Sequence, residues 1–304
     1  MTTNVVPSMN EPPPKSPRRW LRFSLRSMLL LVVVIAIPLA FVPKIQRARN
    51  QRHVVEMLEK FGLGFDAVWI AYDYQIKAGA KGQSDETRRY HDGYSRQKLL
   101  PPVPKWSLGF LGQDYFCEVV EVHFSHHETN AIGGWSYLIA RIATLPEIRS
   151  LSLVTLDELT ASDLAPLFFK MHNLETLELG WVTDKSLEQI SKLERLESFS
   201  IVHPSYRNYR SAIQITDEGL PYIAKLTNLR SLQLGTRNFH PSSGWGCTMV
   251  SDEGLVNLYG LKNLEFLRIN STHITQAGID KLQMALPNCE IEWNVSPAPT
   301  SPEK

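Results

Sequence analysis

The sequence lacks the cysteine pattern of a disulfide framework or a zinc site. Cys117, Cys247 and Cys289 are an odd number, and none of them belongs to a CxxC motif. The chain also lacks an excess of either charge, because 32 Lys and Arg residues face 31 Asp and Glu residues. Binding to nucleic acid depends on a surplus of cations, so the composition predicts no nucleic-acid partner.

Motifs for the common enzyme chemistries are also missing. The chain has no GxSxG, GxxxxGK or GxGxxG, and GWSYL around Ser136 lacks the second glycine of a nucleophile elbow. No residue stands out as catalytic and no cofactor is indicated. We therefore expect a protein that binds something rather than an enzyme.

Long apolar runs are scarce, and the one that stands out lies near the N-terminus. Met28 to Val42 contains 15 residues without a charge, which as a helix cover about 22 Å of a roughly 30 Å hydrocarbon layer. Extension back to Trp20 gives 23 residues, enough to span. A cleaved signal peptide is the rival interpretation, but cleavage after Ala40 would put Pro38 where a small residue is needed. A buried soluble helix is the remaining alternative.

Basic residues flank this run on both sides. Five precede it and four follow: Lys15, Arg18, Arg19, Arg22 and Arg26, then Lys44, Arg47, Arg49 and Arg52. The positive-inside rule favours a cytoplasmic N-terminus by this narrow margin. We predict a disordered, Pro-rich basic tail over residues 1–19, a single-pass membrane anchor over 20–43, and an extracytoplasmic position for the rest.

Internal repeats dominate the second half of the chain. Three segments nearly superimpose: VTDKSLEQISKLERLESFSI from Val182, ITDEGLPYIAKLTNLRSLQL from Ile215 and VSDEGLVNLYGLKNLEFLRI from Val250. In each, apolar residues recur at steps of three, three, three, three and two. The same ladder fits residues 139–153 and 279–293, and a copy with one extra residue fits 164–179.

The spacing predicts a repeated helix–strand unit. Steps of three place residues on one face of a short helix and its exit, and a final step of two fits a strand. One unit cannot bury its apolar stripe, so copies must stack around a shared core. The helix starts carry capping residues followed in three units by an aspartate: Thr183, Thr216, Ser251 and Thr275, with Asp184, Asp217 and Asp252.

The sequence resembles the leucine-rich-repeat family through LTNLRSLQL, LKNLEFLRI and LPEIRSLSL. TDEGL and SDEGL make it most similar to the ribonuclease-inhibitor-like type, although the repeated Cys and the Asn after the strand are missing. RFSLRSMLLLVVV and LPNCEIEW resemble predicted membrane-anchored bacterial repeat proteins of unassigned activity. The resemblance implies an α/β solenoid over residues 117–293, with a parallel β-sheet on the concave face and helices on the convex face.

Residues 44–116 fit no repeat. We expect the helix to continue from Lys44 to Phe61, a strand from Ala67 to Tyr74, and a linker from Ala78 to Pro104. A short helix and a first strand, from Trp106 to Phe124, would cap the open edge of the first repeat. Residues 294–304 are predicted to be a disordered tail.

Two sets of residues are candidates for binding. The first flanks the central strand leucine on the concave face and is mostly small and uncharged, with Phe266 and Arg268 as exceptions: Ser150, Ser152, Thr176, Glu178, Ser198, Ser200, Ser231 and Gln233. The second lies in two insertions of neighbouring units, 202–214 and 235–249, which should emerge side by side: Tyr206, Arg207, Tyr209, Arg210, Arg237, Phe239, His240 and Trp245. Aromatic and Arg side chains are typical of recognition surfaces.

A histidine cluster supplies the only metal hypothesis. His123, His126, His127 and Glu128 have ligand-type side chains, but they match no helical ligand spacing. Three functions therefore stay open. The chain is a membrane-anchored module that binds a protein or another envelope ligand, a structural spacer without a ligand, or, least favoured, a metal-dependent enzyme that uses this cluster. We expect no metal and no cofactor.

Overall fold

The computed structural model describes residues 25–61, 68–73, 101–124, 134–153, 164, 167–168, 170–180, 182–201, 213–235 and 248–294. The chain divides into two compact units, Met1–Gln46 and Arg47–Lys304. The predicted tail 1–19 lies outside the described ranges, and so does the predicted tail 294–304 apart from Asn294, which ends a strand.

The first unit contains most of the apolar part of helix α1, Leu25–Phe61. Within this helix the stretch Met28–Lys60 is long and apolar enough to cross a membrane, and its most apolar window is not buried within the structure. A signal sequence near the N-terminus would pass the same test of length and composition. The helix continues without a break past Lys44, into the second unit.

The second unit opens with a small cap. Strand β1 (Val68–Tyr72) pairs antiparallel with β2 (Val119–Phe124), with Ile70 opposite Val122. Between them come the short helix α4 (Lys105–Leu111) and the 3-10 turn η2 (Gln113–Tyr115).

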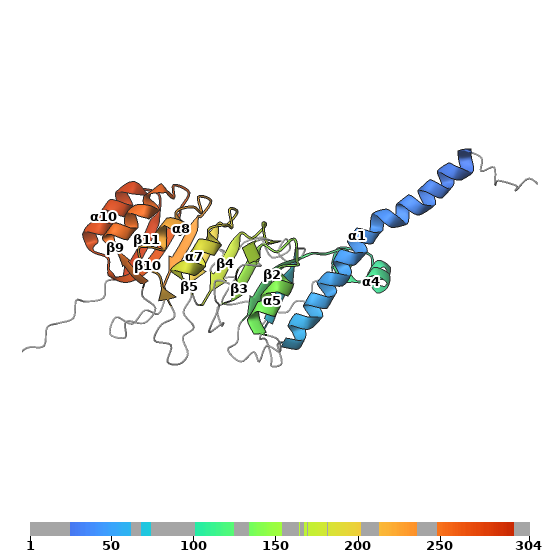
Figure 1. Cartoon of the computed structure of the whole chain (residues 1–304), viewed down its shortest axis with the longest axis horizontal. Helices are drawn as coiled ribbons and strands as arrows, with labels where there is room; N and C mark the ends of the chain where they lie inside the picture. Colours follow the sequence, from blue (N-terminus) through green and yellow to red (C-terminus); the bar gives the residue numbers. More distant parts are fainter. Residues whose placement is uncertain are drawn as a thin grey trace, which may run out of the picture. The chain divides into compact units, whose positions relative to one another are not determined.

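A parallel sheet follows in chain order. Strands β2, β3, β4, β6, β8, β10 and β11 pair successively and in parallel (Figure 1). The strands not yet located are β3 (Ser150–Leu153), β4 (Thr176–Leu179), β6 (Ser198–Ile201), β8 (Ser231–Leu234), β10 (Phe266–His273) and β11 (Glu290–Asn294). This order confirms the predicted mixed α/β class with a parallel sheet.

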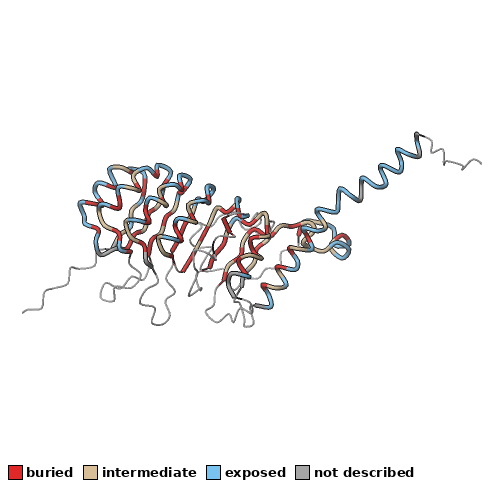
Figure 2. Tube along the Cα trace, in the orientation of Figure 1, coloured by how far each residue is buried: buried red, intermediate tan, exposed pale blue. Residues whose placement is uncertain are grey.

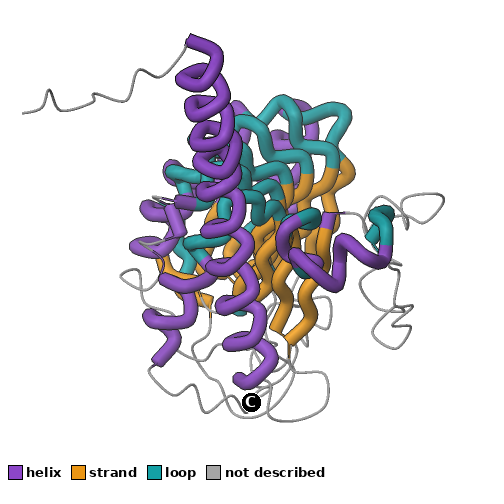
Figure 3. The backbone as a smooth tube through the Cα atoms, turned by 90° about the vertical axis from the view of Figure 1, so that its right-hand side faces the viewer, coloured by secondary structure: helices purple, strands orange, loops and turns teal. Residues whose placement is uncertain are grey.

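Short helices and minor strands connect these strands, and Figure 3 shows the strands as one layer with helices and loops beside it. The helical elements are α5 (Gly134–Ile142), α7 (Asp184–Ile190), α8 (Leu220–Ile223), α9 (Asp252–Leu255), η3 (Val256–Gly260) and α10 (Gln276–Ala285). The minor strands are β5 (Val182–Thr183), β7 (Ile213–Gln214) and β9 (Thr248–Ser251); β5 pairs with β7, and β9 with β10.

The core is built from the aliphatic ladder. Leu151, Leu177, Phe199, Leu232 and Leu267 align across five neighbouring strands, and each is 0% exposed. Figure 2 shows buried positions recurring along the repeats. Full burial of such a side chain contributes roughly 1.5 to 3 kcal/mol. The apolar spacing in the sequence therefore becomes one continuous interior.

The aspartates at the helix starts make contacts between units that the sequence analysis does not predict. Asp217 accepts hydrogen bonds from the backbone N–H and the hydroxyl of Ser251, with donor–acceptor distances of 2.8 and 2.5 Å. Asp184 accepts the same two bonds from Thr216, and Asp252 from Thr275. We call this arrangement the aspartate clamp: a carboxylate that holds the capping residue of the next unit.

Glycines make room for the clamp. A Cβ atom added to Gly254 would lie 1.9 Å from Oδ1 of Asp217, and one added to Gly278 would lie 2.1 Å from Oδ1 of Asp252. For Gly219, the distance to Oδ1 of Asp184 would be 2.2 Å. The glycine of TDEGL and SDEGL is therefore required by the carboxylate of the preceding unit.

The capping prediction itself is confirmed at three helices. The hydroxyls of Thr183, Ser251 and Thr275 accept bonds from first-turn N–H groups. Thr216 accepts a bond from Glu218 N, although α8 begins only at Leu220.

Candidate functional site

The strand positions that do not enter the core form two polar rows. The first row contains Glu121, Ser150, Thr176, Ser198, Ser231, Phe266 and Glu290, and the second contains His123, Ser152, Glu178, Ser200, Gln233, Arg268 and Glu292. We call these two rows the open sheet face. Because side chains alternate along a strand, the rows point away from the aliphatic ladder.

Arg268 is the best-anchored side chain on this face. Its Nε lies 2.7 Å from Oε2 of Glu292, and its Nη1 donates to Oε1 of Gln233 at 2.9 Å. The guanidinium also lies over the Phe266 ring, with 5.1 Å between Cζ and the ring centroid. The Arg268 side chain is only 11% exposed. The two predicted binding residues Phe266 and Arg268 therefore lie together, and the cation is held in place by its neighbours.

On strands β3 and β6, the side chains of the second row are less exposed to solvent than those of the first row. The Ser152 hydroxyl donates to Oε2 of Glu178 at 2.8 Å, across the β3–β4 pair. Ser152 and Ser200 are buried, at 5% and 2% exposure, whereas their first-row neighbours are partly exposed. The first row is therefore the more accessible one.

Charged residues precede several of these strands. Arg230 lies 2.6 Å from Glu265 and 3.6 Å from Glu197, measured between Nη1 and Oε1 and between Nε and Oε2. All three side chains are more than half exposed. Ion pairs at such exposure contribute little to stability, at most about 1 kcal/mol.

This side of the sheet is acidic. The two rows contain four carboxylates and one guanidinium group, a formal charge of 1 − 4 = −3: Glu121, Glu178, Glu290 and Glu292 against Arg268. A field of this sign repels phosphate and attracts cationic groups. The open sheet face thus suits a ligand with basic or neutral polar groups.

The predicted insertion residues Tyr206, Arg207, Tyr209, Arg210, Arg237, Phe239, His240 and Trp245 all fall in the ranges 202–212 and 236–247, outside the described residues. What the structure describes is where these segments begin. The first starts after Ile201 of β6 and the second after Gly235, which follows β8, and Ile201 is paired with Leu234 in register. Gly235 has φ of 135°, a conformation that favours glycine. Both insertions therefore leave the sheet from adjacent strands at the same end.

The metal hypothesis finds one of its four residues in the described structure. His123 lies on β2, opposite Ser152 of β3, while His126, His127 and Glu128 fall in the undescribed range 125–133. Among the residues that the structure describes, no group of three His, Cys, Asp or Glu side chains could hold a metal ion.

Cys117 and Cys289 are buried free thiols at opposite ends of the sheet order. Burial, reinforced by the nearby carboxylates of Asp73, Asp114 and Glu118, raises the pKa of Cys117 to about 11. Burial, together with Glu290, raises the pKa of Cys289 to about 11. Neither thiol has the character of a nucleophile at neutral pH.

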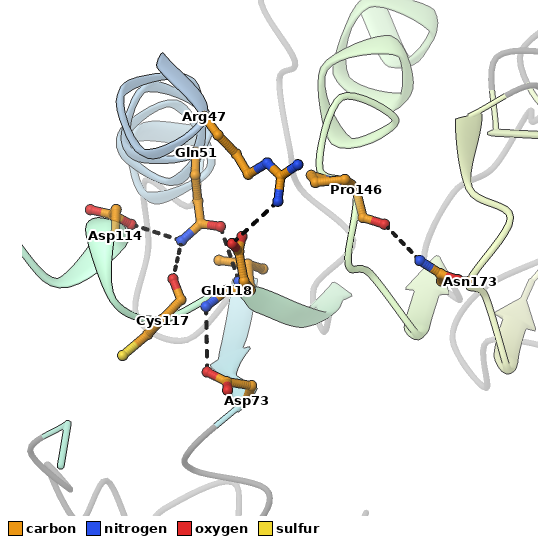
Figure 4. A network of polar contacts seen from close by, with 9 residues as sticks. Arg47, Gln51, Asp73, Asp114, Cys117, Glu118, Pro146 and Asn173 are labelled. Atoms are coloured by element: carbon orange, nitrogen blue, oxygen red, sulfur yellow. Dashed lines mark hydrogen bonds and ion pairs between the residues drawn. The ribbon is translucent and has the colours of Figure 1, made fainter. Parts of the chain in front are cut away.

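Sequence reasoning missed a buried polar network in the cap (Figure 4). Gln51 of α1 is 1% exposed; its Nε2 donates to the carbonyl of Cys117 at 2.8 Å, and its Oε1 accepts from the N–H of Val119 at 3.1 Å. Nε2 also lies 3.1 Å from Oδ1 of Asp114, which accepts a bond from the Tyr72 hydroxyl. Ala48, Val54 and Leu58 are buried on the same helix at steps of three and four, so the place of Gln51 within this apolar stripe is the signal that could have found it.

Comparisons with known proteins give only distant similarities. No protein family matches the sequence. No curated protein matches it either. Among solved structures, internalin C2 of Listeria monocytogenes is 20% identical, with 60% of this chain and 75% of that chain covered and a TM-score of 0.38. Internalin InlF of the same species is 19% identical (50% and 49% covered, TM-score 0.28), and the Leptospira interrogans LRR protein LIC12759 is 16% identical (50% and 45%, 0.28).

This chain thus spans about half the length of the last two proteins. TM-scores below 0.5 do not establish a common fold, so the functional argument depends on the chain's own repeat and surface.

Proposed function

We propose that this protein is a membrane-anchored leucine-rich-repeat solenoid of the ribonuclease-inhibitor-like type, which binds a protein ligand. The observation that carries the proposal is the in-register pairing of the LxxLxL segments, whose leucines fill one core while the intervening residues form the open sheet face. A repeated scaffold with one continuous exposed polar face is the arrangement that repeat proteins use for extended binding surfaces.

The ligand surface that we propose combines the open sheet face with the two insertions. The insertions begin after adjacent strands, β6 and β8, and we assign their aromatic and Arg residues to the ligand surface because of their residue types. Aromatic and Arg residues supply most of the binding energy in protein interfaces. The negative charge of the open sheet face would favour a ligand segment that carries Lys or Arg. The proposal assigns no catalytic residue and no cofactor.

We further propose that α1 is an uncleaved anchor, with the N-terminus cytoplasmic and the repeats outside the cytoplasm. Support comes from an unburied apolar helix long enough to span and from the excess of one basic residue on the N-terminal side.

Crosslinking mass spectrometry of the full chain in its native membrane tests the binding function. The variant Tyr209→Ala/Trp245→Ala should lose its crosslinked neighbour with an unchanged melting temperature. Met284→Ala is the matched control, because Met284 is 83% exposed and lies on α10, outside both insertions and the open sheet face. A neighbour that survives the double substitution would refute the insertion surface, and no specific neighbour in the wild type would favour the structural spacer.

A further inference from the structure

Helix α4 carries an exposed apolar pair that the repeat function does not use. Trp106 is 78% exposed and Phe110 is 90% exposed, while Leu111 is 41% exposed. Residues four apart lie on the same side of a helix, so Trp106 and Phe110 form one apolar edge. An isolated exposed apolar residue needs no explanation, but two adjacent aromatic side chains at this exposure indicate a contact surface.

The cap holds this helix at a defined place. Gly112 ends α4 with φ of 81°, and its N–H donates to the carbonyl of Leu108. The guanidinium of Arg52 covers Gly112 so closely that a Cβ there would lie 1.9 Å from Nη2. Arg52 Nε in turn lies 3.3 Å from Oδ2 of Asp114. The aromatic edge is therefore presented from a packed support.

The chain itself places a bilayer within reach, whatever the arrangement of the two units. The second unit begins at Arg47, five residues after Val42 ends the apolar run. Five residues span at most about 18 Å, at 3.3 to 3.6 Å each. If α1 is a membrane anchor, the cap starts close to the headgroup layer, which is roughly 5 to 8 Å thick on each side.

The chemistry of the edge fits that layer. Tryptophan concentrates at the boundary between headgroups and acyl chains, where its ring is buried and its N–H stays hydrated. Lys105 immediately precedes Trp106, and α1 carries Lys44, Arg47, Arg49 and Arg52, of which Arg47 and Arg52 are paired with Glu118 and Asp114. Basic residues near a membrane surface are attracted to anionic lipids by about 1 kcal/mol each.

We propose that Trp106 and Phe110 of α4 bind the headgroup boundary of the bilayer that holds α1. This contact attaches the second unit, Arg47–Lys304, to the membrane at a second point. The orientation of its ligand surface relative to the membrane is then restricted. The inference rests on the proposed anchor.

Tryptophan quenching in the full chain tests this contact. The protein is reconstituted into vesicles of phosphatidylcholine and phosphatidylglycerol, with and without bromine atoms on the acyl chains. The difference in fluorescence between wild type and Trp106→Phe isolates the emission of Trp106. We expect brominated lipid to quench this difference. We expect acrylamide to quench it less than it quenches a fully exposed tryptophan. Phe110→Asp should reverse both effects.

Met284→Trp provides the matched control, since it introduces an exposed tryptophan on α10; acrylamide should quench its added emission and brominated lipid should not. Vesicle flotation separates the two possible failures. A chain that does not float with the vesicles refutes the anchor, and with it this contact. A chain that floats, but whose Trp106 is quenched by acrylamide alone, refutes the contact and leaves the anchor intact. Protection of Trp106 from both quenchers would mean that protein covers the edge, and it would equally overturn the proposal.

Discussion

Removal of the central aspartate clamp should lower the free energy of unfolding of the repeat region by more than is usual for a substitution at the surface. In Asp217→Ala the N–H and the hydroxyl of Ser251 lose the carboxylate that accepts them at 2.8 and 2.5 Å. These two donors belong to the next unit, 34 positions along the chain. The substitution therefore loosens the contact between two units, whereas each unit keeps its own helix and strand.

The magnitude follows from the charge and the partial burial of the pair. A hydrogen bond to a charged group contributes roughly 1.5 to 3 kcal/mol, and partial access of water favours the lower end. Two such bonds, partly replaced by water, give an expected loss of about 2 to 3 kcal/mol in the free energy of unfolding. Asp217→Asn keeps one acceptor oxygen, and we expect about half of that loss.

A double-mutant cycle with Gly254 isolates the clamp from other effects. Gly254→Ala places a Cβ 1.9 Å from Oδ1 of Asp217, so the carboxylate must leave Ser251. Both single substitutions then remove the same two bonds. In the double variant the closest remaining contact is Cβ to Cβ, at 3.1 Å, which a shift of a few tenths of an ångström relieves. The loss in the double variant should therefore be smaller than the sum of the two single losses by about 1 kcal/mol or more.

Urea unfolding of the full chain in a non-ionic detergent, followed by circular dichroism, measures these changes. For ordinary urea sensitivities of 1 to 3 kcal/mol per molar, the loss in Asp217→Ala lowers the midpoint by roughly 0.7 to 3 M. Glu218→Ala is the control, because Glu218 is exposed beside the clamp, and it should shift stability by less than about 0.5 kcal/mol. Additive losses in the cycle, or equal losses in Asp217→Ala and Glu218→Ala, would show that the clamp does not stabilise the stack.

Three further perturbations have defined outcomes. Leu232→Ala opens a cavity in the core and should cost about 2 to 5 kcal/mol in urea unfolding, whereas Ser231→Ala on the open sheet face should cost less than about 1. Gln51→Ala leaves a buried N–H and a buried carbonyl without the side chain that bonds them. We expect it to lower the free energy of unfolding by about 2 to 4 kcal/mol and to speed hydrogen exchange at β2. Cys117 and Cys289, with pKa values of about 11 instead of 9.0, should react with iodoacetamide at pH 8 roughly 100-fold more slowly than unfolded thiols, by site-resolved mass spectrometry. Because folding favours their protonated form, their contribution to stability is present below pH 9 and is lost as pH rises through 11.

The sheet was predictable because its signal is local. Leu232 and Leu234 are two residues apart, so they face one side, and the ladder that precedes them fixes where the helix must end. Once several units share that spacing, stacking in parallel is the arrangement that buries all ladders together. The alignment of Ser198 with Ser231 on the other side follows from the same register.

Contacts between units were harder to predict, because no local pattern encodes a partner. Gln51 lies in line with Val54 and Leu58 on the buried face of its helix, but its bonding partners are 66 and 68 positions away, and nothing in the helix identifies them. Arg268 was recognised as an unusual residue on the face, but its bonds to Gln233 and Glu292 depend on three strands that come from different parts of the chain. Charge and residue type suggest such roles only after the register is known.

The aspartate clamp nevertheless leaves a trace in the sequence, in the form of a rule that links consecutive units. Gly219, Gly254 and Gly278 each belong to a unit whose predecessor carries a clamp aspartate, and each would clash with that carboxylate if it had a Cβ. The unit of α7 has Ser186 at the glycine position, and in the preceding copy the aligned residue is Ala161, which has no carboxylate to accommodate. Gln276, at the aspartate position of the unit of α10, donates to Asp280 within its own helix instead. Aspartate in one unit and glycine in the next are thus one structural feature, so the TDEGL and SDEGL motifs encode the contact between units as well as a helix start.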